Sequence, residues 1–70
     1  MPTPFEVRDY IRRMILAGYR PDEAAANAQV ELRITDEFQI EDLEPIARME
    51  LEALRHDPFY QNRLQRSGLA

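Results

Sequence analysis

Four prolines divide the 70-residue chain into short segments, each of which opens with residues that favour the start of a helix. Proline fixes its own φ angle and has no amide hydrogen, so it suits the first turn of a helix and disrupts the interior. These prolines are Pro4, Pro21, Pro45 and Pro58. We therefore predict an all-α fold, a small bundle of three or four helices that forms a single domain over residues 1–70.

The first predicted helix has signals at both ends. Thr3 is a good N-cap, Pro4 suits the first helical position, and Glu6 completes a capping box with Thr3. Gly18 suits the left-handed position after the helix, and Tyr19 supplies the apolar contact of a Schellman ending. At helical pitch the apolar side chains share an arc of roughly 160°. They are Val7, Tyr10, Ile11, Met14, Ile15 and Ala17.

The second predicted helix begins at Pro21 and has acidic residues in its first turn, where the helix dipole favours negative charge. Its small residues Ala24, Ala25 and Ala28 favour a close approach to the first helix. We predict that it continues to about residue 34. The alternative is a short β-hairpin near residues 30–40, in which Val30, Leu32 and Ile34 share one face and Phe38 and Ile40 lie across a turn.

Residues 35–44 are interpreted as an acidic connector, in which Thr35 or Asp36 caps a short turn. Pro45 disfavours a helical conformation at Glu44, so the third helix is predicted from about Pro45 to His56. Asp57 and Pro58 then form the cap and first turn of a fourth helix, over about 58–66, which ends at Ser67-Gly68.

The composition excludes several kinds of site. The chain has no cysteine, so it has no disulfide and no thiolate ligand for zinc, and its one histidine, His56, rules out a multi-histidine metal site. We expect no cofactor, no bound metal and no membrane span. The start of the chain lacks the pattern of a secretory signal, which favours the cytoplasm or a particle assembled there. The chain has nine arginines and no lysine, which indicates either a GC-rich bacterial or phage gene or selection for the bidentate contacts that arginine makes.

The third predicted helix carries apolar residues over an arc of roughly 200°, which exceeds a single packing stripe. Met49 and Ala53 belong to this arc, and Glu50 falls near its middle. A carboxylate there needs a partner. One interpretation is an internal ion pair with an arginine of the first helix. The other is a docking residue that meets an arginine across an interface.

Two further surfaces are candidates for a partner. The acidic stretch, with Asp36, Glu37, Glu41 and Asp42 around Phe38, is either a solvated face or a strip that docks on a basic surface. It lacks the ligand spacing and the glycine of a calcium loop. Phe59 and Tyr60 are adjacent, so one is expected to pack inward while the other faces solvent or a partner.

A nucleic-acid contact is the alternative function, because the first two helices have the outline of a helix-turn-helix. Its candidate residues are Arg8, Arg12, Arg13 and Arg20. The second helix, which would enter the groove, begins Asp22-Glu23, and this charge disfavours contact with phosphates. The competing interpretation is that the arginines pair internally, for example as Asp9–Arg13 and Glu44–Arg48.

These features predict a non-enzymatic protein-interaction module, a small accessory or regulatory factor with no catalytic residue. The partner is a larger protein or another copy of the chain, as in a dimer. The expected partner-binding residues are Met49, Glu50, Ala53, Phe59, Tyr60, Asp36, Glu37, Phe38, Glu41 and Asp42.

Overall fold

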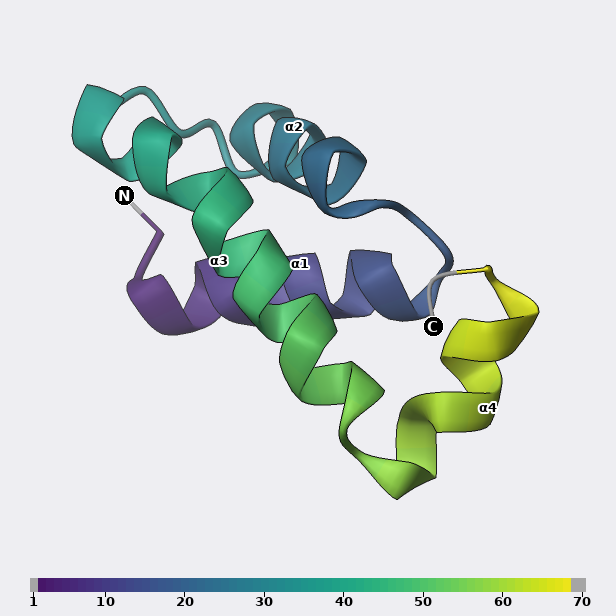
Figure 1. Ribbon diagram of the computed structural model, residues 1–70. Helices are drawn as coiled ribbons and strands as arrows, with labels where there is room; N and C mark the ends of the chain where they lie inside the picture. Colours follow the sequence, from purple (N-terminus) through teal and green to yellow (C-terminus); the bar gives the residue numbers. More distant parts are fainter. Residues whose placement is uncertain (1, 69–70) are drawn as a thin grey trace.

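The computed structural model describes residues 2–68, which form four helices and no strand. The helices are α1 (Pro4–Leu16), α2 (Pro21–Glu31), α3 (Glu37–Arg55) and α4 (Pro58–Arg66). The predicted all-α class is confirmed. α3 is the longest helix and crosses α1, α2 lies beside both, and α4 turns back from the end of α3 (Figure 1).

Both ends of α1 are as predicted. The Thr3 hydroxyl accepts a hydrogen bond from the Glu6 amide at 3.2 Å, and the Glu6 carboxylate accepts one from the Thr3 amide at 3.4 Å. At the other end, the amide of Gly18 donates to the Ile15 carbonyl and that of Tyr19 to the Met14 carbonyl, which is a Schellman ending. Gly18 has a φ of 103°, which favours glycine because a side chain would be strained there.

α2 ends at Glu31, so the prediction of a helix to residue 34 was too long, and the alternative hairpin was wrong. The helix closes with the same pair of turn hydrogen bonds as α1, donated by the amides of Arg33 and Ile34. Arg33 occupies the left-handed position, with a φ of 53°, where glycine is usual. The next residue, Ile34, is buried in the core. Its burial offsets the strain at Arg33.

α3 begins at Glu37 rather than Pro45, so the predicted acidic connector is instead the first two turns of this helix. The Asp36 side chain caps it by accepting a hydrogen bond from the Gln39 amide at 3.0 Å. Pro45 lies inside the helix on an exposed face and has no amide hydrogen for the carbonyl of Glu41. This loss is tolerated because the added turns bring Leu43 into the core.

The core lies where α3 meets α1 and α2. The small residues Ala24, Ala25 and Ala28 of α2 are all buried, in a helix that contacts both α1 and α3. Ala17, predicted on the apolar face of α1, is instead its exposed C-cap. α4 adds one buried residue, Leu64, and the predicted Asp57 cap and Pro58 start are confirmed. The buried apolar residues are Val7, Ile11, Ile15, Ala24, Ala25, Ala28, Ile34, Leu43, Ala47, Leu51, Leu54 and Leu64.

Across residues 2–68, none of the helices combines the length and apolar character needed to pass through a membrane.

The position of Pro45 predicts that Pro45→Ala stabilises the fold. Alanine restores the missing helical donor, and we expect the free energy of unfolding to rise by about 2 kcal/mol in urea denaturation. Pro58→Ala is the matched control. Pro58 is at the first position of α4, where no donor is required. This change should lower stability by less than about 1 kcal/mol. Equal effects of the two substitutions would contradict an interior helical position for Pro45.

Candidate functional site

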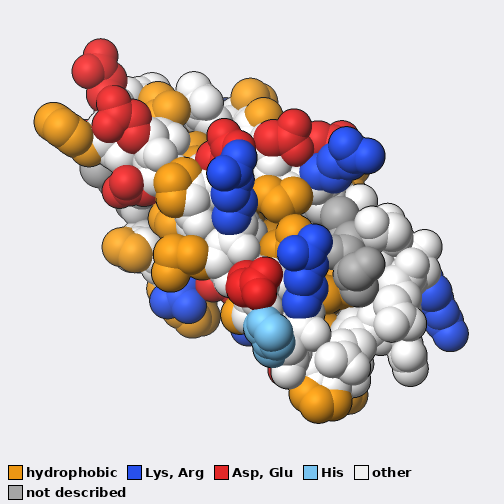
Figure 2. Space-filling view, in the orientation of Figure 1, with side chains coloured by type: hydrophobic (Ala, Val, Ile, Leu, Met, Phe, Trp, Pro, Cys, Tyr) orange, Lys and Arg blue, Asp and Glu red, His pale blue; other side chains and the backbone are white. Residues whose placement is uncertain are grey.

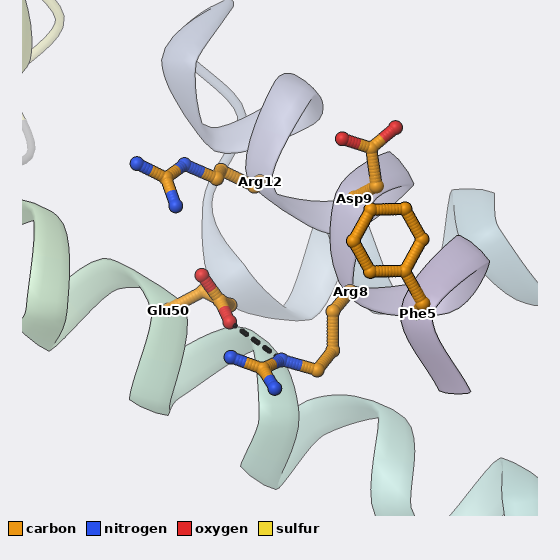
Figure 3. A pocket seen from close by; sticks show the side chains of 5 residues that line it. All are labelled: Phe5, Arg8, Asp9, Arg12 and Glu50. Atoms are coloured by element: carbon orange, nitrogen blue, oxygen red, sulfur yellow. Dashed lines mark hydrogen bonds and ion pairs between the residues drawn. The ribbon is translucent and has the colours of Figure 1, made fainter.

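Two adjoining hollows on the surface between α1 and α3 share Arg8 and Glu50. The first lies mostly along α1 and the second along α3. We call them together the Arg8 groove. It is lined by Phe5, Arg8, Asp9, Arg12, Ile46, Met49, Glu50 and Ala53. Figure 3 shows the α1 part, where the side chain of Arg8 extends from one helix to Glu50 on the other.

An ion pair forms the floor of the groove. The Nε atom of Arg8 donates a hydrogen bond to Oε1 of Glu50 at 3.0 Å (Figure 3). Glu50 is only 7% exposed, whereas the Arg8 side chain is 66% exposed. Among the described residues, no buried side-chain nitrogen or oxygen lacks a hydrogen-bond partner. Of the two interpretations of Glu50, the structure shows the internal pair with an arginine of the first helix.

The rim of the groove is apolar. Met49 is 71% exposed and Phe5 is 77% exposed, while Ile46 is half-buried between rim and core. Ala53 is also exposed, and because its side chain is small the rim is shallow at this position. Of the residues predicted to bind a partner, the structure brings Met49, Glu50 and Ala53 together here. Phe5 was missed as a site residue because it falls on the polar side of α1 in a helical projection.

The acidic candidate residues occupy the first two turns of α3. Phe38 is 79% exposed and is surrounded by exposed Glu37, Glu41 and Asp42. We call these four residues the acidic end. None of its three carboxylates takes part in an ion pair between described residues. Figure 2 shows acidic and hydrophobic side chains gathered at the end of the molecule where α3 begins. Asp36 lies beside them but serves as the helix cap.

The aromatic pair on α4 is divided between core and solvent, as predicted. Tyr60 packs against the core, whereas Phe59 is 82% exposed. Their rings meet edge to face, with centroids 4.9 Å apart. The guanidinium of Arg12 lies over the Tyr60 ring, 5.4 Å from its centroid. The contact between Arg12 and Tyr60 therefore links α4 to the α1 side of the Arg8 groove.

The four candidate arginines do not share one free basic surface. Arg8 pairs with Glu50, Arg12 covers the Tyr60 ring, and Arg13 pairs with Asp9 at 2.6 Å. Arg20 precedes α2 and lines a separate hollow. The predicted i, i+4 pairs are confirmed for Asp9–Arg13 and for Glu44–Arg48, which is also 2.6 Å.

At the end of α3, His56 changes the ionisation of a neighbouring carboxylate. Its Nε2 atom lies 2.9 Å from Oε1 of Glu52. This hydrogen bond lowers the pKa of Glu52, and the charges of His56 and Arg55 add to the effect. Both side chains are exposed and lie outside the Arg8 groove.

Within the described part of the chain, no three His, Asp or Glu side chains cluster in a way that could hold a metal ion. Comparison of the chain with models of protein families, with curated proteins and with solved structures finds no match.

The buried position of Glu50 predicts that Arg8→Met destabilises the fold. It leaves a carboxylate buried without its partner, which should lower the free energy of unfolding by about 1–3 kcal/mol. Adding Glu50→Leu to Arg8→Met should recover most of the loss. The control is Arg13→Met, which removes an exposed pair and should cost less than about 0.5 kcal/mol. Urea denaturation measures all three, and equal losses for the two single variants would exclude a structural ion pair.

The Glu52–His56 contact predicts a pH-dependent contribution at the end of α3. The folded-state pKa of Glu52 is lowered, so its contribution to stability is present above the ordinary glutamate pKa and is lost as pH falls through the lowered value. His56→Ala should raise the pKa of Glu52 toward its ordinary value. A carboxyl-carbon titration by NMR measures this change. An unchanged titration midpoint in the variant would rule out the contact in solution.

Proposed function

We propose that this chain is a non-enzymatic protein-interaction module that docks on its partner through the Arg8 groove. The single observation that carries the proposal is the arrangement of exposed apolar side chains around a satisfied ion pair. Met49 and Phe5 form the rim, and Glu50 is already bonded to Arg8 on the floor. Clustered exposed apolar side chains are typical of interaction surfaces, whereas scattered single ones are not.

The rim residues have the properties of interface anchors. Met49 has a flexible, polarisable side chain that adapts to the shape of a partner, and Phe5 offers a large aromatic surface. Burying either side chain against a partner would contribute about 1.5–3 kcal/mol. The exposed N–H groups of Arg8 can add a bidentate contact with a carboxylate of the partner.

The same observations favour a protein partner over a nucleic acid. The charges of Arg8 and Arg13 are offset by carboxylates of the chain itself, which reduces the net positive charge presented to phosphates, and Arg12 lies over an aromatic ring. An apolar rim also suits protein side chains better than a phosphate backbone. We propose further that the module is a bacterial or phage accessory factor of the cytoplasm. The all-arginine basic composition supports this origin.

The proposal predicts that Met49→Glu weakens capture of the partner. The tagged chain and the variant are used as baits in an extract of the native host. We expect at least a tenfold loss of the captured protein, because the substitution places a charge on the apolar rim. Val30→Glu is the matched control, since Val30 is similarly exposed at 74% but lies on α2, outside the groove. Equal capture by both variants would exclude the Arg8 groove as the docking surface.

A further inference from the structure

α3 presents a second line of side chains, mostly apolar but interrupted by Asp42, on the face that its own fold leaves uncovered. The residues of this line recur at intervals of four, three, four and four, and they fall within an arc of roughly 80°. This arc lies roughly 160° from the centre of the buried stripe of α3. Phe38 and Met49 are its most exposed large members. The line consists of Phe38, Asp42, Pro45, Met49 and Ala53, all exposed.

We propose that a second copy of this chain covers that line, with the two α3 helices packed antiparallel about a two-fold axis between Pro45 and Ile46. This inference rests on the proposed function and names the partner of a surface that shares Met49 and Ala53 with the Arg8 groove. From Phe38 to Met49 the intervals of four, three and four match the heptad seam along which helices pair at shallow crossing angles, and Ala53 lies one residue beyond the next heptad position. Because such a contact is isologous, every contact occurs twice.

This register places the largest side chain of the line opposite the smallest. Phe38 and Ala53 are separated by fifteen residues, which is roughly 22 Å of helix. In an antiparallel pair, Phe38 of each copy therefore lies over Ala53 of the other. Ala53 lines the α3 part of the Arg8 groove, so the phenyl ring has a recess to enter. The apolar Pro45 and Ile46 then meet at the axis.

The exposed guanidinium of Arg8 supports the same pairing. Glu41 comes opposite Glu50 of the second copy, whose charge is already balanced by Arg8, and Asp42 comes opposite Met49. Neither Glu41 nor Asp42 forms an ion pair between described residues. Arg8 donates to Glu50 through Nε and keeps a side chain that is 66% exposed. A guanidinium has five N–H donors, so others remain for a second carboxylate. The acidic end of each copy thus meets an arginine.

Repulsion between like charges selects this register over the neighbouring one. If Phe38 were placed over Met49, the two copies of Asp42 would lie only about 4–5 Å apart along the helices. With Phe38 over Ala53, the separation is about 10 Å, which is close to the Debye length in physiological salt. The apolar pairing and the charges therefore agree on one arrangement.

The first test is a sedimentation-velocity series on the full chain from about 1 μM to 1 mM, in which we expect a monomer–dimer equilibrium. Phe38→Arg and Ala53→Glu should each weaken the dimer at least tenfold. An equimolar mixture of the two variants should recover dimer, because one native contact remains and the introduced arginine and glutamate meet in the other. Val30→Glu is the control and should associate like the native chain.

The second test uses the absence of cysteine from the native chain. Pro45→Cys places one thiol per copy beside the proposed axis, and mild oxidation should yield a disulfide-linked dimer. Val30→Cys should remain mostly monomeric under the same conditions. This readout does not depend on the folding of the two charged variants.

The outcomes separate this inference from the proposed function. A chain that stays monomeric at 1 mM, or a dimer that neither charged variant weakens, overturns the α3 pairing. Failure of the mixture to recover dimer overturns the antiparallel register. In each of these cases the Met49→Glu capture experiment still decides whether a different protein occupies the Arg8 groove.

Discussion

The burial of one stripe of α3 is the constraint on which the rest of the structure depends. α3 is the only helix of residues 2–68 that contacts each of the other three substantially. Its stripe, from Leu43 to Leu54, packs on α1 and on the alanine face of α2, and α4 follows from its end. Because a chain this short has little other apolar surface to bury, the length and direction of α3 determine where the remaining helices can lie.

Much of the fold could be predicted from the sequence, because α1, α2 and α4 each begin at a proline. The errors occur where packing overrides a local signal. Pro45 was interpreted as a helix start, yet burial of Leu43 extends α3 back to Glu37. Likewise, Arg33 gives no stop signal, and only the burial of Ile34 explains why the backbone turns there.

The candidate site was predictable only in part, because a projection of one helix does not show how that helix crosses its neighbours. A helical projection placed Glu50 among apolar residues, which implied a partner, but could not choose among the arginines of α1. That choice depends on how α1 crosses α3, which brings Arg8 within hydrogen-bonding distance. A projection of α1 alone also could not show that Phe5 lines a hollow, because that hollow includes Glu50 of the neighbouring helix.

The slight attachment of α4 has a consequence for the Arg8 groove. Its single buried residue is Leu64, so this helix can detach at a smaller free-energy cost than global unfolding, in the manner of a local opening. Detachment would withdraw the Tyr60 ring from Arg12 and release that guanidinium over the Arg8–Glu50 pair. The electrostatic potential of the Arg8 groove is thus coupled to the seating of the last helix.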